Sequence, residues 1–261
     1  MRPAQKLLPF YYKYNSTRFA DNQGLCTYKE CDSIIFRNTT ERSQMDTGAE
    51  RNEEMKLSKL GLFGILSLLS YTAMVVFSPI AYPGYNWVST AVSELSAVGA
   101  PSKELAEYLN CLHGPCSLVC IMAVCVAVQN CKTKLLRIGI YCFAGMEWVS
   151  SIGYKLFPWV SDAPNSHPQN VMHLVTTAFV VILSLASMIL SIIGSKKEGM
   201  KSLFVLAIVC LTSMILGPFG MAVFPESIFG IFERFSVFSA VVFNAGLGVH
   251  LFLDKFGKEF K

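Results

Sequence analysis

The chain has 261 residues, of which 52% are hydrophobic and only 15% are charged. A soluble domain carries roughly 25% charged residues, so this composition argues against a soluble protein and favours a surface solvated by lipid. The net charge of +4 is small and no nucleic-acid-binding motif is present, so DNA and RNA are not expected as partners.

The first 54 residues differ from the rest of the chain. They are polar, contain eight basic and eight acidic residues, and show no sustained hydrophobic period. Such a segment cannot bury enough apolar surface to fold, so residues 1–54 are predicted to be a disordered cytoplasmic extension. Met55 begins the run Met-Lys-Leu-Ser-Lys directly before the first apolar segment and looks like a natural start. The second predicted domain therefore comprises residues 55–261.

This second domain contains six apolar segments, each close to the 20 or so residues that an α-helix needs to cross a bilayer. The predicted spans are residues 57–81, 105–128, 135–157, 171–194, 203–224 and 228–253. Gly114 and Pro115 lie near the start of the second span, where proline is tolerated or bends the helix. The predicted fold class is all-α, a polytopic membrane protein built as a six-transmembrane-helix bundle.

Lysine and arginine are unequally distributed between the two ends of these spans. Lys103 and Lys155 lie at one end. The other end carries Lys56, Lys59, Lys132, Lys134, Arg137, Lys196, Lys197, Lys201, Lys255, Lys258 and Lys261. Cytoplasmic loops are enriched in these residues, so both termini are predicted to be cytoplasmic. The plasma membrane and an internal membrane both fit this prediction.

The first predicted non-cytoplasmic loop, residues 82–104, is rich in aromatic and hydroxyl side chains. Its aromatic residues suit the lipid headgroup zone. A polar row is formed by Ser89, Thr90, Ser93 and Glu94, and an apolar row by Val88, Ala91, Val92 and Leu95. This spacing predicts a short interfacial or re-entrant helix that ends at Gly99. The alternative is a folded loop that caps the bundle.

Three ionisable residues fall inside the predicted spans: Glu147 in the middle of the third, and Glu233 with Arg234 about two turns into the sixth. An isolated charge at such depth is costly, so Arg234 is expected to pair with Glu147 or Glu233. One interpretation is a structural ion pair. The other is a headgroup site, because the planar fork of arginine suits phosphate and carboxylate groups. The predicted headgroup-binding residues are Ser93, Glu94, Glu147, Glu233 and Arg234.

Three histidines and one aspartate are also predicted at the non-cytoplasmic side: His113, Asp162, His167 and His173. Zinc takes histidine and carboxylate ligands, which makes these residues candidate metal ligands. Their spacing, however, does not place two histidines on one helix face. We therefore expect no cofactor, with zinc as the alternative. Helix capping and headgroup hydrogen bonding are the other roles open to these side chains.

Several short motifs, taken in order, resemble a known family. They are Ser93-Glu94-Leu95-Ser96-Ala97 with Gly99 and Pro101, Asn110 with Gly114, Phe157-Pro158 with Asp162 and a following histidine, and Gly230-x-x-Glu233-Arg234. This ordered set resembles the uncharacterised membrane family called domain of unknown function 998. The resemblance covers about residues 57–253. It implies a six-helix membrane bundle and no established activity.

A more distant similarity runs to the Frag/DRAM/Sfk group of six-span membrane proteins. These proteins also have a serine-acid motif and a proline in the first non-cytoplasmic loop. Their Ile-Ser-Asp type motif is replaced here by Val92-Ser93-Glu94, and the rest of the chain aligns poorly. Members of the group are associated with lipid remodelling and autophagy, so this similarity implies a lipid-related role.

Three functions are compatible with these observations. The favoured hypothesis is a non-enzymatic membrane protein that binds or organises membrane lipids at its non-cytoplasmic face, which requires a lateral opening near Arg234. The second is a membrane-embedded lipid hydrolase that uses Ser93, Asp162, His167 and His173, arranged either around a metal ion or as a Ser–His pair. The third is a small transporter, although the cytoplasmic halves of the spans have few ionisable groups to form a polar path.

Overall fold

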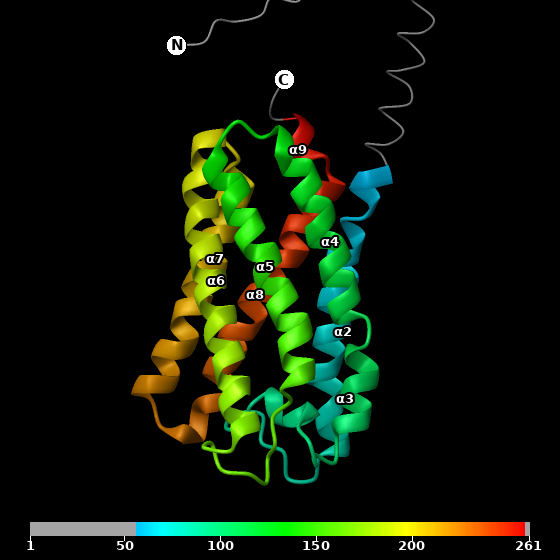
Figure 1. Ribbon diagram of the computed structural model, residues 1–261, viewed down its shortest axis with the longest axis vertical. Coiled ribbons are helices and arrows are strands. Elements are labelled where there is room, and N and C mark those ends of the chain that lie inside the picture. The colour runs from blue at the N-terminus through cyan, green and yellow to red at the C-terminus, as the bar shows by residue number, and fades with distance from the viewer. Residues whose placement is uncertain (1–55, 259–261) are drawn as a thin grey trace, which may run out of the picture. The chain divides into compact units, whose positions relative to one another are not determined.

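The computed structural model describes residues 56–258, among which there are helices and turns but no β-strand (Figure 1). Six helical segments within these residues are long and apolar enough to cross a membrane. They are Lys56–Ala81, Lys103–Asn130, Lys134–Leu156, Pro168–Glu198, Lys201–Val223 and Glu226–Phe252. Their bounds differ from the predicted spans by a few residues at most, so the predicted six-helix membrane bundle is confirmed. The predicted extension, residues 1–54, lies outside the described residues.

The helices are α2 (Leu62–Phe77), α3 (Lys103–Asn110), α4 (His113–Ala127), α5 (Lys134–Leu156), α6 (Pro168–Glu198), α7 (Lys201–Val223), α8 (Phe229–Phe252) and α9 (Lys255–Lys258). Short 3₁₀ helices extend or connect them: η1 (Ser78–Ala81), η2 (Ser93–Ser96), η3 (Val128–Asn130) and η4 (Glu226–Ile228). Residues 78–102, 157–167 and 224–228 gather at one end of the bundle, which we call the loop end (Figure 1). The opposite end is called the lysine end.

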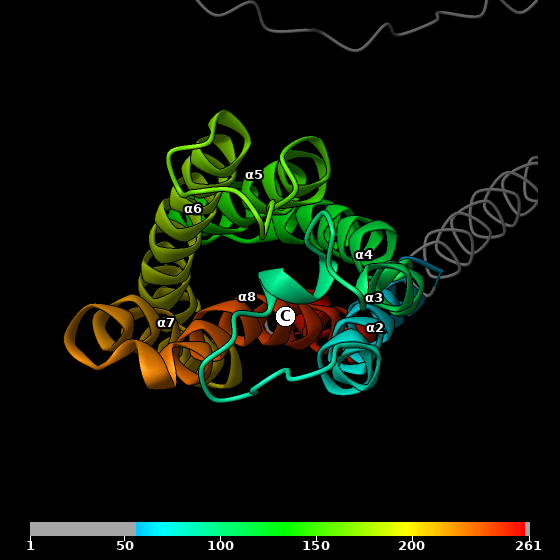
Figure 2. The ribbon, with the colours of Figure 1, turned by 90° about the horizontal axis from the view of Figure 1, so that it is seen from below.

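The long helices form a closed ring in the order α2, α4, α5, α6, α7, α8 (Figure 2). Helix α8 packs against both of its ring neighbours and also against α4. About 56% of its membrane-spanning window is buried, compared with 28% for α6. Polar side chains on α8 therefore face other helices more often than they face lipid.

Small residues allow α8 to approach α2 closely. A Cβ atom added at Gly61 would lie 2.1 Å from the Gly248 carbonyl oxygen, and one added at Gly248 would lie 2.3 Å from the Gly61 carbonyl oxygen. Gly64 similarly faces the backbone of Asn244 and Ala245. Such contacts between backbones are a common way for helices to associate in lipid, where burial of apolar side chains supplies little driving force.

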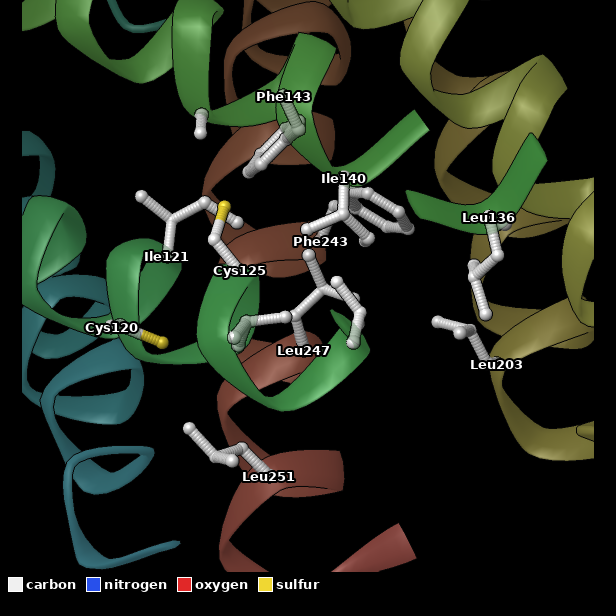
Figure 3. Packing of buried hydrophobic residues seen from close by; sticks show 14 of the residues in the cluster. Cys120, Ile121, Cys125, Leu136, Ile140, Phe143, Leu203, Phe243, Leu247 and Leu251 are labelled. Atoms are coloured by element: carbon white, nitrogen blue, oxygen red, sulfur yellow. The ribbon is translucent and has the colours of Figure 1, made fainter. Parts of the chain in front are cut away.

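Two hydrophobic clusters fill the bundle. The larger one extends toward the lysine end and includes Phe143 of α5 and Phe243 of α8, whose rings pack edge to face with centroids 5.0 Å apart (Figure 3). The smaller one combines Tyr71 and Met74 of α2 with loop residues. In this second cluster, Val92 and Leu95 are almost fully buried, so the first loop closes the loop end with apolar side chains.

The second span is interrupted before its proline. Helix α3 ends at Asn110 and α4 begins at His113, which places Pro115 in the first turn of α4. The N–H groups of a first helical turn have no intrahelical partner, so a proline there removes no helix hydrogen bond. Pro218 lies inside α7, where the missing N–H does disrupt the ladder, and Figure 1 shows this helix bent near its loop end.

The predicted interfacial helix in the first loop is wrong in extent. Only the four residues Ser93–Ser96 are helical, and they form one 3₁₀ turn. Before this turn the Ser89 and Thr90 N–H groups donate to the Asn86 carbonyl oxygen, but the Val92 N–H donates to Glu233 Oε2 of α8, so the helical hydrogen bonds do not continue into the turn. Gly99 has a φ of +90°, which glycine adopts readily, and lies in a turn after the 3₁₀ helix.

Candidate functional site

The guanidinium of Arg234 is the centre of the polar contacts between α8 and the first loop. Its Nη1 donates hydrogen bonds to the carbonyl oxygens of Gly230 at 2.6 Å and Thr90 at 3.2 Å. Its Nη2 donates to the Tyr85 hydroxyl at 2.6 Å. Arginine has five N–H donors, so two stay unused by protein. One of them is on Nε, which is buried and has no hydrogen-bond partner among the described residues.

Aromatic residues of the loop shape the surroundings of this cation. The Arg234 guanidinium carbon lies 4.4 Å from the ring centroid of Trp87, which is a cation–π contact. Tyr85 accepts from Arg234 and lies 3.2 Å from the Ala91 carbonyl oxygen, to which its hydroxyl donates. Burial raises the pKa of Tyr85, and Arg234 opposes that shift. The phenol therefore stays neutral at physiological pH.

Two further contacts hold the loop on the first turns of α8. The Ile231 N–H donates to the Val88 carbonyl oxygen at 3.2 Å. A Cβ atom at Gly230 would lie 2.5 Å from the Thr90 carbonyl oxygen, so the loop backbone lies directly on that glycine. Together with the bond from Val92 to Glu233, these contacts fix the position of Trp87 and Tyr85 around Arg234.

The expected ion pair of Arg234 with Glu147 or Glu233 is wrong. Among the residues that the structure describes, the salt bridge within 4.0 Å is Lys103 with Glu107, on the surface of α3. The Glu233 carboxylate instead accepts a hydrogen bond from the Val92 backbone N–H of the first loop. Glu147 Oε2 lies 2.8 Å from Ser117 Oγ, near the level of Asn244, which is ten residues and thus about 15 Å along α8 from Arg234. The positive charge of Arg234 is therefore not neutralised by a contacting carboxylate.

A groove of about 480 Å³ runs beside Arg234 between α7 and α8. Its lining is Trp87, Val209, Cys210, Ser213, Ile231, Arg234, Phe235, Phe238, Ser239 and Val242. Val209 is 56% exposed and Phe235 is 44% exposed, so the groove opens sideways from the bundle and not only toward the loops. The apolar groove is thus open to the lipid side and has a cation, Arg234, at its loop end.

The other predicted headgroup residues have different surroundings. Glu94 Oε2 accepts a hydrogen bond from Ser161 at 2.5 Å, which ties the first loop to the second. Ser93 begins the 3₁₀ turn directly after Val92. These residues thus belong to the loop assembly beside Arg234, whereas Glu147 lies deeper in the bundle.

The candidate metal ligands are not brought together. Within residues 56–258, no three histidine, cysteine, aspartate or glutamate side chains are grouped so that they could hold a metal ion. His113 Nδ1 lies 2.9 Å from Ser67 Oγ, between α4 and α2. His173 Nδ1 lies 2.8 Å from the Phe157 carbonyl oxygen. His167 caps α6 by accepting from the Gln169 N–H.

Among the described residues, Asp162 makes no hydrogen bond with these histidines. A Cβ atom added at Gly99 would lie 3.4 Å from Asp162 Oδ2. Asp162 of the second loop therefore lies close to Gly99 of the first loop. The zinc and hydrolase alternatives required convergence of Asp162 with His167 and His173. The described geometry gives each of them a local role in capping or in loop packing.

Sequence reasoning missed the roles of three residues at this end of the bundle. Asn170, which is fully buried, exchanges hydrogen bonds with both backbone groups of Val160 and also donates to the carbonyl oxygens of Ala163 and Pro164. Tyr85 and Trp87 were assigned to the headgroup zone rather than to Arg234. Spacing along the chain does not predict such contacts, because the loop partners of Arg234, Thr90 and Tyr85, lie more than 140 residues away.

The fold and this site define the class: a multi-pass integral membrane protein whose loop end closes over a buried arginine beside a lateral groove. The family model described as "Protein of unknown function (DUF998)" matches residues 65–250. The chain therefore belongs to that family, as its motifs indicated. No curated protein and no solved structure matches the chain.

Proposed function

We propose that this protein binds an anionic membrane lipid, with the acidic headgroup at Arg234 and an acyl chain in the groove between α7 and α8. The observation that carries the proposal is the state of Arg234: it is 5% exposed, and among residues 56–258 no carboxylate contacts it and no group accepts from its buried Nε donor. A buried cation with unused donors is costly unless an anion completes its surroundings.

The depth of the site fits a lipid. Arg234 is five residues from the start of α8 at Phe229, which corresponds to about 8 Å along the helix axis. A headgroup phosphate or carboxylate lies near this depth, and the hydrogen bonds to Gly230, Thr90 and Tyr85 hold the guanidinium there. Arginine also matches such groups with two parallel N–H donors. The apolar lining of the groove suits a hydrocarbon chain that enters from the side.

We further propose that the loop end faces away from the cytoplasm and that both termini are cytoplasmic. The support is the charge distribution, because lysine and arginine cluster at the opposite end of the bundle. In this orientation Arg234 binds lipid of the non-cytoplasmic leaflet.

The experiment is native mass spectrometry of the purified full-length protein with phosphatidylglycerol, a fatty acid or phosphatidylcholine. An acidic lipid is expected to stay bound in preference to phosphatidylcholine, and the two acidic lipids separate a phosphate headgroup from a carboxylate. Substitution Arg234→Gln removes charged hydrogen bonds worth about 1.5–3 kcal/mol, and affinity should fall roughly ten- to hundredfold.

The matched control is Arg137→Gln, which removes the same charge at the lysine end, where Arg137 makes a single long hydrogen bond to the Gln129 carbonyl oxygen. Its lipid affinity should equal that of the unmodified protein. Equal retention of acidic lipid by the Arg234→Gln and Arg137→Gln proteins would contradict the proposed site.

A further inference from the structure

A second buried polar centre lies deeper in the bundle, at Glu147 of α5. Glu147 is 13 residues from Lys134 and nine from Leu156, so it is about 20 Å and 14 Å from the two ends of its helix. It is 5% exposed. Among the described residues no lysine, arginine or histidine lies within 4.0 Å of its carboxyl group. An ionised carboxylate in this place would lack a compensating charge.

The hydrogen bonds around Ser117 of α4 indicate which group holds the proton. Ser117 Oγ lies 2.8 Å from Glu147 Oε2 and 3.0 Å from the Gly114 carbonyl oxygen. A hydroxyl has one hydrogen, and a backbone carbonyl can only accept. If Glu147 were ionised, both acceptors would compete for that hydrogen. If Glu147 carries a proton, Ser117 donates to Gly114 and accepts from Glu147, and both contacts are complete.

Helix α8 adds a third partner. The Asn244 side-chain amide donates to the Ser117 carbonyl oxygen at 3.3 Å. Its Oδ1 atom is buried and has no hydrogen-bond partner among the described residues. Asn244 therefore ties α8 to the turn of α4 that carries Ser117, and its buried oxygen is an acceptor to which none of the described residues donates.

We infer that Glu147, Ser117 and Asn244 form a proton-binding site in the middle of the bundle, with Glu147 as the protonated group. The ligand is a proton, and the site is independent of the lipid proposed at Arg234. Since Ser117 is on α4 and Asn244 on α8, loss of the proton leaves a charge between three packed helices.

The test is infrared difference spectroscopy of the full-length protein in lipid nanodiscs at neutral pH. A protonated carboxyl group has a C=O stretch separate from that of a carboxylate. The unmodified protein should show this band, and Glu147→Gln should remove it, because an amide replaces the acid with similar shape. Glu107→Gln is the control, since Glu107 is exposed and paired with Lys103, and this substitution should leave the band unchanged.

An identical protonated-acid region in the unmodified and Glu147→Gln proteins would overturn the inference. If the glutamine variant does not fold, the unmodified protein decides the matter by reaction with a hydrophobic carbodiimide, which attacks protonated carboxyl groups in apolar surroundings. An adduct mapped to Glu147 supports the site. Recovery of the Glu147 peptide without an adduct overturns it.

Discussion

Arg234 is held in a way that a lysine would not reproduce. Its guanidinium donates in three directions and stacks on Trp87, whereas an ammonium group is a compact charge without a planar face. The contact between Arg234 and Tyr85 depends on a single atom of the tyrosine, its hydroxyl oxygen. Removal of that oxygen leaves another N–H of Arg234 without a partner, and it also removes the hydrogen bond to Ala91.

Tyr85→Phe is therefore expected to lower stability by about 1–3 kcal/mol, because a buried donor on a charged group loses its acceptor. The measurement is the thermal unfolding midpoint in detergent. Tyr82→Phe is the matched control: Tyr82 packs against the Tyr85 ring, and its hydroxyl makes no hydrogen bond with the part of the chain that the structure describes. Similar midpoints for the two variants would show that the Tyr85 hydroxyl is not a structural contact of Arg234.

Among the helices, α8 determines how tightly the bundle closes. It contacts α2 through glycine backbones, and its polar residues reach the first loop at one end and α4 in the middle. In lipid, such backbone approaches contribute through close packing, so even a methyl group at the contact forces the helices apart.

Gly248→Ala is expected to destabilise the bundle, because the new methyl group would lie 2.3 Å from the Gly61 carbonyl oxygen and cannot be accommodated without displacement of α2. Gly145→Ala is the comparison, since a Cβ atom there meets no atom within 4 Å. The alanine at position 145 should be neutral or slightly stabilising, given the better helix propensity of alanine. Unfolding midpoints of the two variants that differ in the opposite order would refute this packing.

The helices were predictable from the sequence, and most of their contacts were not. Hydropathy and span length fixed all six spans within a few residues, because lipid requires about 20 apolar residues whatever the helix packs against. The 3₁₀ turn at Ser93–Ser96 was predicted as a longer helix, since local spacing does not reveal that the Val92 N–H bonds to Glu233. Pairing of Arg234 with a carboxylate was predicted only because an isolated charge in a membrane is energetically costly. In the structure, backbone carbonyl oxygens and the Trp87 ring surround the guanidinium instead.

At the scale of the whole molecule, the two ends of the bundle differ in chemistry. The loop end carries aromatic side chains, the connected loops and Arg234 at one end of the groove, and the lysine end carries most of the positive charge. The proposed orientation follows from this difference. It also determines which leaflet supplies lipid to the groove.

A glycosylation sequon in a flexible segment inserted after Pro164 should be modified in microsomes, because the second loop is expected in the lumen. The same segment inserted after Lys132, in the connection between α4 and α5, should stay unmodified. The readout is a shift in gel mobility that an endoglycosidase reverses. Modification at Lys132 and none at Pro164 would invert the proposed topology.

The central claim, that an acidic lipid lies in the groove beside Arg234, is tested most directly by photo-crosslinking with an anionic phospholipid that carries a diazirine in its acyl chain. Adducts are expected on groove residues of α7 and α8, such as Ser213, Phe235 and Val242. Ser213→Trp, which fills the groove, should abolish them, whereas Thr212→Trp, at an exposed neighbouring position, should not. Adducts spread evenly over the exposed apolar surface, for example at Leu69 and Ile182, and unaffected by Ser213→Trp would contradict the account.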